Sequence, residues 1–544
     1  MSANAANEQA DITVETIRCA EKLADLSFTD GERAQMLDEV RERVAAYRQL
    51  RAVDLPNSTP PALVFDPQPL AKTRPAAPAP RRPLELPAAD LPADLAELAF
   101  WPVHRLAGLI RTRQISAAAL TELYLERLKR FDPQLQCVIT LTEELAREQA
   151  QRADAEIAAG RYRGPLHGIP WGAKDLLAVR GYPTTWGATP YREQVIDMDA
   201  TVVQRLEAAG AVLVAKLSMG ALAWGDVWFG GTTKTPWDLK QGASGSSAGS
   251  GAATAAGLVG FAIGTETWGS IVSPATRNGV SGLRPTFGRV SRHGAMALSW
   301  SMDKIGPMCR SVQDCALVFQ AIHGPDASDP TVVDRPFVWP RTVDLARLRI
   351  GYVADAFESD YAGRDNDLRT LDALRALGAD LIPIQLPAFP SDALQIILTV
   401  EAAAAFDELT RTNRDDLLVR QSNDAWPNVF RQARLIPAVE YIQANRIRTQ
   451  LMQAMAELMD EIDVYVAPSI ETDNLLLTNL SGHPAVVVPN GFSAAGLPTS
   501  ITFTGGLFEE ELALAVARIC QDATDFHQQH PRHFDDQREE KSPG

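Results

Sequence analysis

GASGSSAGSGAATAAGLVGFAIGTETWGSIVSPA, residues 242–275, is the stretch that decides how this chain of 544 residues is interpreted. It surrounds a short apolar run with glycines and serine hydroxyls, which is a poor composition for a packed core. Glycine permits positive φ and lets a ligand approach the main chain closely. Upstream, GPLHGIPWGAKD, residues 164–175, adds a basic group, Lys174. Serines with one lysine predict a site for acyl transfer, because a serine hydroxyl needs a nearby base.

Several local patterns offer alternatives to this interpretation. Gly245–Gly249 fits the G-x-S-x-G nucleophile elbow centred on Ser247, but the elbow follows an apolar strand, and Lys240–Ser244 is not one. Ser301-x-x-Lys304 fits S-x-x-K without its companion motifs. Lys174 could instead lie at the surface. The serines at 246, 247 and 250 could then simply cap the helix that follows.

Several linked motifs, in order, carry a resemblance to a known family. GPLHGIPWGAKD resembles the lysine motif of the amidase signature family, ASGSSAGS its Gly/Ser loop and GTETWGSIVSPA its nucleophile loop. GVSGLRPTFGRVSRHG, 279–294, and SMDKIGPMCRSVQD, 301–314, resemble the continuation of that signature. The resemblance covers roughly residues 95–535. It implies a serine hydrolase with a Ser–Ser–Lys triad, and a large mixed β-sheet surrounded by α-helices.

Carried over by position, the resemblance assigns roles to individual residues. Ser270 is the nucleophile, Ser246 the bridging serine that follows a cis peptide, and Lys174 the base. The base must be neutral, which burial favours by penalising the ammonium form. The backbone N–H groups of Thr267, Trp268, Gly269 and Ser270 are expected to form the oxyanion hole.

The nucleophile loop departs from the family's frequent G-T-D-T-G-G-S-I-R. Glu266 stands at the position of the pattern's aspartate, and Trp268 at the position of a glycine. Val272 stands where the pattern has an arginine, whose charge usually braces the loop. Trp224, Trp228 and Phe229 are candidates to line an apolar substrate pocket, although they could equally belong to the core.

The expected reaction is hydrolysis of an amide C–N bond, with an apolar or aryl substrate favoured. Esters and carbamates are alternatives, because their carbonyls meet the same nucleophile. Another alternative within the family is the catalytic subunit of a glutamine-dependent amidotransferase. A non-catalytic binding protein on this fold is disfavoured by the intact Lys174, Ser246 and Ser270.

Short apolar runs alternate with helical patterns outside the motifs, which predicts an α/β fold. Helices are expected around Leu106–Ile110, around Leu120–Leu128 and over 140–160. The expected strands lie at Ala211–Ala215, Gly257–Ile263, Leu348–Val353, Asp463–Ala467 and Pro484–Val488.

Four regions are expected along the chain: an N-terminal helical hairpin (1–52), a proline-rich linker (53–95), the catalytic domain (96–535) and a C-terminal tail (536–544). Eleven of the 36 prolines lie between Pro56 and Pro92, and such density favours an extended chain. Thr29-x-x-Glu32 has the form of a capping box. Two helices alone cannot bury both apolar faces, so the hairpin should dock on the body or on a second subunit.

Composition limits the function classes. A net charge of −16 and a pI near 5.1 oppose binding to nucleic acid or to anionic membranes. Five scattered cysteines and an N-terminus without a signal pattern indicate a cytoplasmic protein. The histidines 527, 530 and 533 are expected in a solvated tail. A small-molecule amide is the expected partner, with no metal and no cofactor; a homodimer is left open.

Overall fold

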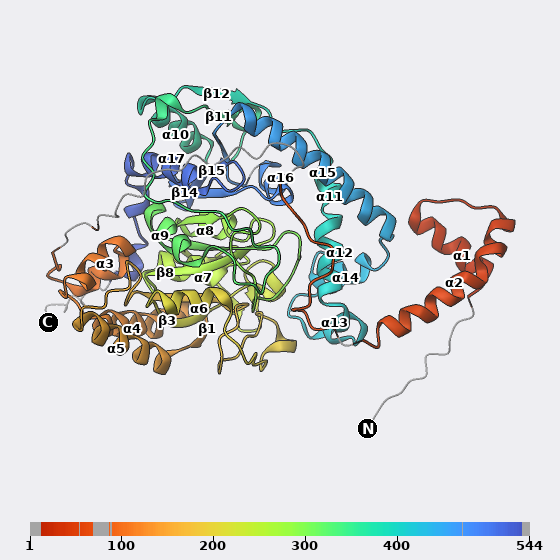
Figure 1. Ribbon diagram of the computed structural model, residues 1–544, viewed down its shortest axis with the longest axis horizontal. Coiled ribbons are helices and arrows are strands. Elements are labelled where there is room, and N and C mark those ends of the chain that lie inside the picture. Colours follow the sequence, from red (N-terminus) through yellow and green to blue (C-terminus); the bar gives the residue numbers. More distant parts are fainter. Residues whose placement is uncertain (1–11, 54, 69–85, 87–89, 471, 536–544) are drawn as a thin grey trace.

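One large β-sheet forms the core of the molecule (Figure 1). The computed structural model describes residues 12–53, 55–68, 86, 90–470 and 472–535. The extreme N-terminus, the tail 536–544 and the proline run from 73 to 85 therefore lie outside the described residues. The sheet has eleven strands, in the order β1-β3-β2-β8-β10-β9-β14-β15-β13-β11-β12.

The sheet is mixed, as the α/β prediction requires. Strand β2 is parallel to β3 and β8, β11 is parallel to β12 and β13, and the remaining neighbours are antiparallel. Its strands are β1 (Val138–Leu141), β2 (Pro170–Lys174), β3 (Val212–Leu217), β8 (Phe261–Glu266), β9 (Ser281–Arg284), β10 (Lys304–Cys309), β11 (Ile350–Val353), β12 (Leu381–Ile384), β13 (Val464–Pro468), β14 (Ala485–Phe492) and β15 (Pro498–Gly505). Two small hairpins lie outside it: β4 (Val227–Trp228) with β5 (Gly231–Thr232), and β6 (Lys234–Thr235) with β7 (Asp238–Gly242).

Helices cover the sheet, and every residue of β2, β3, β8 and β10 is buried. Strands buried on both faces are typical of sheets covered by helices on both sides. The helices of the body are α3 (Val103–Arg111), α4 (Ala117–Leu135), α5 (Glu143–Ala158), α6 (Thr201–Ala208), α7 (Ala248–Ala255), α8 (Val272–Asn278), α9 (Val312–Ile322), α10 (Arg364–Ala376), α11 (Ser391–Leu394), α12 (Ile396–Ala405), α13 (Asp407–Arg411), α14 (Trp426–Ala433), α15 (Ala438–Glu461), α16 (Asn474–Ser481) and α17 (Glu510–Asp522). No helix among the described residues has both the length and the apolar character needed to span a membrane.

Most of the expected elements are present. The three expected helices are α3, α4 and α5, and four of the five apolar runs coincide with β3, β11, β13 and β14. The run Gly257–Ile263 is only partly strand: β8 begins at Phe261, because Gly257 adopts a positive φ of 66° in the turn after α7.

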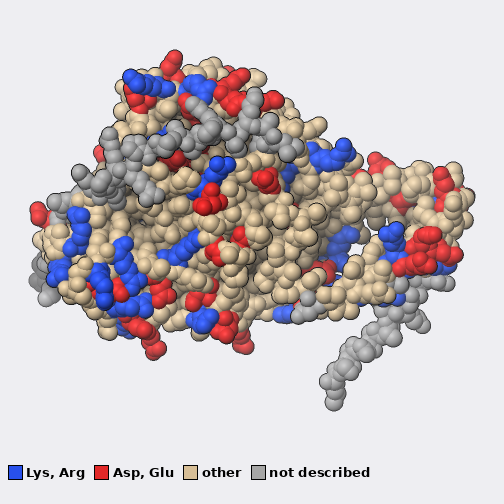
Figure 2. Space-filling model, in the orientation of Figure 1, with Lys and Arg blue, Asp and Glu red and all other residues tan. Residues whose placement is uncertain are grey.

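The N-terminal helices project from the body as an arm (Figure 1). They are α1 (Val14–Glu21) and α2 (Asp30–Leu50), and the predicted capping box of Thr29 and Glu32 is confirmed. An ion pair between Arg33 Nη2 and Glu21 Oε1 (2.5 Å) joins the two helices. Acidic and basic side chains are interspersed on the visible face of the arm and the body (Figure 2).

The segment with the C-terminal histidines packs on the body, and only His533 has the exposed side chain that the sequence predicts for all three. The His530 ring stacks on Phe100 with 3.9 Å between centroids, and His533 Nε2 lies 2.7 Å from Gln134 Oε1. Phe534 is fully buried against Phe131. That buried aromatic residue holds the segment on the body.

Candidate active site

The expected triad residues gather at one edge of the sheet. Lys174 is the last residue of β2, which runs parallel to β8, so the carboxyl ends of both strands lie at the same edge. Residues 267–270 follow β8 directly, and Ser246 and Ser247 come immediately before α7. Lys174 and Ser246 are thus neighbours in space although 72 residues apart in sequence.

The Lys174 ammonium nitrogen lies among hydroxyl groups. Nζ donates to Ser246 Oγ (2.7 Å), Ser247 Oγ (3.0 Å) and Thr265 Oγ1 (2.9 Å). Ser246 follows a cis peptide bond with Gly245, as the family resemblance implied. Ser247 is the N-cap residue of α7, but its side chain makes no capping hydrogen bond. The helix-capping alternative therefore does not describe this serine.

Burial changes the chemistry of Lys174. Its side chain is fully buried, and no carboxylate is among its hydrogen-bond partners in the described part of the chain. Desolvation lowers the pKa of Lys174 to about 7, against the opposing charges of Asp303 and Glu266. A large fraction of Lys174 is therefore uncharged at neutral pH and can accept a proton.

Ser270 lies on the loop between β8 and α8, next to the serine pair. Its side chain is buried, and its carbonyl oxygen accepts a hydrogen bond from the N–H of Ser247 (3.2 Å). Gly269 adopts a φ of 79°, which glycine adopts without strain. Among the described residues, no protein acceptor is found for the N–H groups of Trp268, Gly269 and Ser270. These donors can therefore bind an oxyanion.

Glu266 braces this loop from inside the protein. Its Oε2 accepts the N–H groups of Ile271 (2.8 Å) and Val272 (3.0 Å), and its Oε1 is 2.8 Å from Arg284 Nη1. Burial raises the pKa of the Glu266 carboxyl, but Arg284 and these hydrogen bonds outweigh burial and lower it to about 2. Position 272 is a valine, and Arg284 supplies a positive charge behind the loop.

Asp303 holds the other end of the loop. Its carboxylate accepts from Thr267 Oγ1 (2.5 Å) and from the N–H groups of Leu298 (2.8 Å) and Ser299 (3.0 Å). Burial raises the pKa of the Asp303 carboxyl above its ordinary value, although these hydrogen bonds act in the opposite direction. Neither Asp303 nor Thr265 is predicted from the sequence, although both lie inside its signature motifs. Hydrogen bonding through side chains gives no periodic signal by which such residues could be found.

A cavity of about 90 Å³ adjoins the loop. Thr265, Thr267 and Asp303 line it together with Trp300 and with residues of the N-terminal segment. The candidate aromatic residues 224, 228 and 229 are not among its described lining residues, although Ala223 is. The Trp224 ring packs on Trp426 at 5.0 Å, and the Trp228 and Phe229 rings pack together at 4.9 Å.

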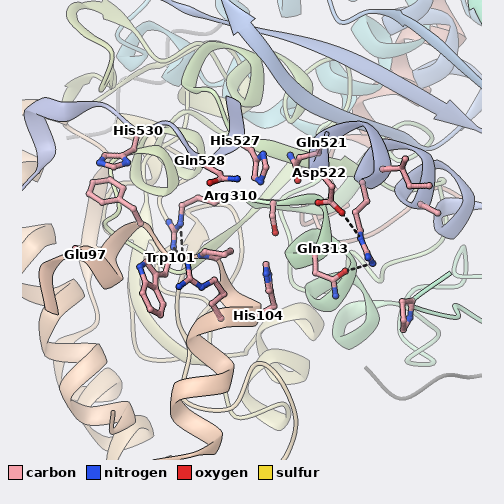
Figure 3. A pocket seen from close by; sticks show the side chains of 18 of the residues that line it. Glu97, Trp101, His104, Arg310, Gln313, Gln521, Asp522, His527, Gln528 and His530 are labelled. Atoms are coloured by element: carbon pink, nitrogen blue, oxygen red, sulfur yellow. Dashed lines mark hydrogen bonds and ion pairs between the residues drawn. The ribbon is translucent and has the colours of Figure 1, made fainter. Parts of the chain in front are cut away.

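A larger groove of about 1,110 Å³ lies at the far end of β10 (Figure 3). Arg310, just after β10, lines it, whereas Lys304 at the start of β10 lines the cavity beside the loop. A six-residue strand is about 20 Å long, which separates the two hollows. His104 and His527 face each other across the groove, and the triad residues, all of which the structure describes, are not part of its lining. They do not line the smaller cavity either, which reaches the nucleophile loop through Thr265 and Thr267.

Comparison with known proteins agrees with the geometry. A family model described as Amidase matches residues 119–514. The chain is 35% identical to the A subunit of the Glutamyl-tRNA(Gln) amidotransferase of Roseiflexus sp. (strain RS-1), over 77% of this chain and 95% of that protein. It is 36% identical to the Putative amidase AmiD of Mycobacterium bovis, over 78% and 94%. The structure of the native peptide amidase from Stenotrophomonas maltophilia superposes with a TM-score of 0.68 at 29% identity, over 80% of this chain and 98% of that one.

Proposed function

Because this chain belongs to the amidase family, we propose that it hydrolyses a carboxylic amide through an acyl-enzyme on Ser270, with Ser246 as proton relay and Lys174 as base. As a member of that family, the protein is a hydrolase of amide C–N bonds. The observation that carries the triad assignment is the buried Lys174, hydrogen-bonded at 2.7 Å to Ser246 Oγ.

The first half of the cycle forms the acyl-enzyme, an ester between the substrate's acyl group and Ser270. Ser270 Oγ bonds to the substrate carbonyl carbon while its proton passes to Ser246 Oγ and the Ser246 proton passes to neutral Lys174. The carbonyl oxygen becomes an oxyanion, which the N–H groups of residues 267–270 stabilise. Lys174 then returns a proton through Ser246 to the nitrogen, the C–N bond breaks, and the amine leaves.

The second half releases the acid. Water adds to the acyl carbon and gives its proton through Ser246 to Lys174, and the same N–H groups stabilise the second oxyanion. The bond between the acyl carbon and Ser270 Oγ then breaks, and the proton returns to Ser270. No group beyond the triad and water is needed to balance either half.

The cavity supports an apolar or aryl substrate group. Met296, Leu298 and Trp300 contribute apolar walls next to Thr267. Its 90 Å³ is smaller than the roughly 300–1,000 Å³ of pockets that enclose a whole drug-sized ligand. We therefore expect it to hold one group of the substrate, and the aromatic residues 224, 228 and 229 remain candidates for contacting the rest.

The names of relatives support a second candidate function, the glutaminase half of an amidotransferase. Trp268 in the nucleophile loop and the N-terminal extension favour a stand-alone amidase. Glutamine hydrolysis that rises when a tRNA-binding partner protein is added would reverse this preference. Esters and carbamates are further substrates that the same nucleophile and oxyanion donors would accept.

The test combines covalent labelling with kinetics. A fluorophosphonate should label Ser270, located by mass spectrometry, and Ser270→Ala should abolish both labelling and amide hydrolysis while the far-UV circular dichroism is unchanged. Robust turnover by the folded Ser270→Ala variant would refute the assignment. A hydrolysis screen over amides, anilides, esters and carbamates then identifies the preferred bond.

We also propose that the protein is a homodimer in the cytoplasm. Leu23, Leu26 and Leu50 on the arm are more than half exposed, and a second copy is the simplest partner to cover them. All five cysteines are free thiols, which supports a reducing compartment.

A further inference from the structure

The segment that follows the arm lies across the body close to the candidate active site. In Figure 1 it runs from α12 towards α16. Asn57 fixes its first part: Nδ2 donates to the carbonyl oxygen of Ala297 (2.8 Å), and Oδ1 accepts the N–H of Ala297 (2.8 Å). One side chain thus satisfies both backbone groups of one residue, as a neighbouring strand would.

Phe65 fixes the second part of the segment. Its ring lies 3.6 Å from the guanidinium of Arg448 and 5.0 Å from the Phe287 ring. Arg448 is buried and donates to Ser301 Oγ (2.8 Å) and to the Ser301 carbonyl oxygen (2.9 Å). Both anchors therefore act on the same loop, residues 297–301.

That loop is coupled to the nucleophile loop. The N–H groups of Leu298 and Ser299 bind the carboxylate of Asp303, which also accepts from Thr267 Oγ1. The 90 Å³ cavity lies between the two loops, and Asn57, Ser58 and Pro60 form part of its wall. Three residues of the N-terminal segment thus share a cavity with Thr267, whose N–H is an expected oxyanion donor.

We propose that residues 57–60 form the outer wall of the substrate site and select, by size, the substrate group that enters this cavity. The proposal rests on the proposed amidase function. The selected group is apolar or aryl, because Met296, Leu298 and Trp300 line the same space. Of the charged residues in the lining, which also include Asp303 and Lys304, Arg292 and Asp329 pair with each other (3.1 Å). Residues 57–60 precede residues 119–514, the part of the chain that the family model matches. This part of the selectivity is therefore provided by the N-terminal extension.

Ser58→Trp tests the wall directly. Ser58 is exposed, so the indole can enter the cavity without disturbing the core, and Leu63→Trp on the same segment, where Leu63 is 73% exposed, is the matched control. Two series of anilides are compared, one with a growing acyl group and one with a growing amine. In the series whose varied group enters the cavity, KM of Ser58→Trp should rise about tenfold or more over wild type for the largest group and change less than about twofold for the smallest. An apolar group excluded from its pocket loses binding of this size.

Fluorophosphonate labelling of Ser270 separates the two possible failures. If wild type is labelled but Ser58→Trp changes neither series more than Leu63→Trp does, the wall proposal is wrong and the proposed function stands. If wild-type Ser270 is not labelled, the proposed function itself fails.

Asn57→Ala provides the second variant, because it removes both hydrogen bonds to Ala297. With the wall released, the ratio of kcat/KM between the largest and the smallest substrate should change several-fold, because selection by size acts on that ratio. An equal fall of kcat for every substrate would contradict a role in selection.

Discussion

Ser246 and Ser247 are adjacent residues whose hydroxyl groups have different surroundings. Ser247 Oγ donates to the carbonyl oxygen of Thr265 (3.1 Å) and accepts its N–H (3.1 Å), besides the contact with Lys174. Ser246 Oγ has Lys174 as its hydrogen-bond partner among the described residues. A hydroxyl that must take and give a proton needs a free site, and that requirement favours Ser246 as the relay.

We expect Ser246→Ala and Ser247→Ala to differ in activity. Loss of the relay should lower kcat by about 10²–10⁴, the usual contribution of a positioned acid–base group. Loss of Ser247, which holds Thr265 in place, should lower kcat by about tenfold or less and reduce thermal stability. Steady-state kinetics with one amide and thermal unfolding of both variants provide the measurement. A larger kcat loss in Ser247→Ala would transfer the relay role to Ser247.

The pH dependence of kcat/KM should report Lys174. Its pKa of about 7 means that the neutral, proton-accepting form is lost as pH falls through 7. We expect kcat/KM to rise tenfold per pH unit below 7 and to level off above it, because the profile follows the base in the free enzyme. A midpoint near 10, the value of an ordinary lysine, would contradict a desolvated base. His293→Asn is the control, since it removes the histidine that lines the cavity and leaves Lys174 in place.

At the scale of elements, sequence patterns predict strands where the strand is a run of apolar residues. β11 (IGYV) and β13 (VYVAP) are found in this way. β2 (PWGAK) is missed because a proline, a glycine and Lys174 interrupt its apolar pattern, and β10 (KIGPMC) because a proline, a glycine and Lys304 do so. Strands that carry site residues are selected for chemistry as well as for packing, so their hydrophobic pattern is weaker.

The motifs assign the candidate triad but not the residues that support it. Lys174, Ser246 and Ser270 are assigned from sequence, and the structure brings Lys174 to Ser246 and the Ser270 loop to Ser247. Asn57 and Ala297 are 240 residues apart in sequence, and a single side chain makes the contact between them. No local pattern carries information of that kind.

The Glu266–Arg284 pair should be the main internal brace of the nucleophile loop. Both side chains are fully buried, so Glu266→Gln leaves Arg284 charged without its counter-ion and should cost about 3–5 kcal/mol in the free energy of unfolding. Glu122→Gln is the matched control: its pair with Arg147 is about 40% exposed and should cost less than about 1 kcal/mol. Urea unfolding followed by tryptophan fluorescence measures both. Equal losses would show that burial of the Glu266 pair adds nothing.

At the scale of the whole molecule, the N-terminal extension has two parts with different surroundings. The segment 55–68 is held on the body through Asn57 and Phe65, whereas α1 and α2 project from it (Figure 1). Contacts within the arm include the buried side chain of Ile17, the buried pair of Arg33 with Glu21 and the exposed pair of Arg18 with Asp30 (2.6 Å). Helices that pack on no larger core are marginally stable in water, so we expect an apolar partner to stabilise the arm.

We expect that partner to be a second copy of the chain. The wild-type protein should have twice the monomer mass of 59.1 kDa in light scattering after size exclusion, and the double substitution Leu23→Glu and Leu26→Glu should give the monomer, because buried carboxylates at an apolar contact are strongly unfavourable. Glu39→Gln on the exposed face of α2 is the control and should leave the dimer intact. A monomeric wild type, or a dimer that survives the double substitution, would contradict an interface at the arm. Because the wall of residues 57–60 is anchored on its own body, hydrolysis of the smallest amide should be unchanged in the monomeric variant.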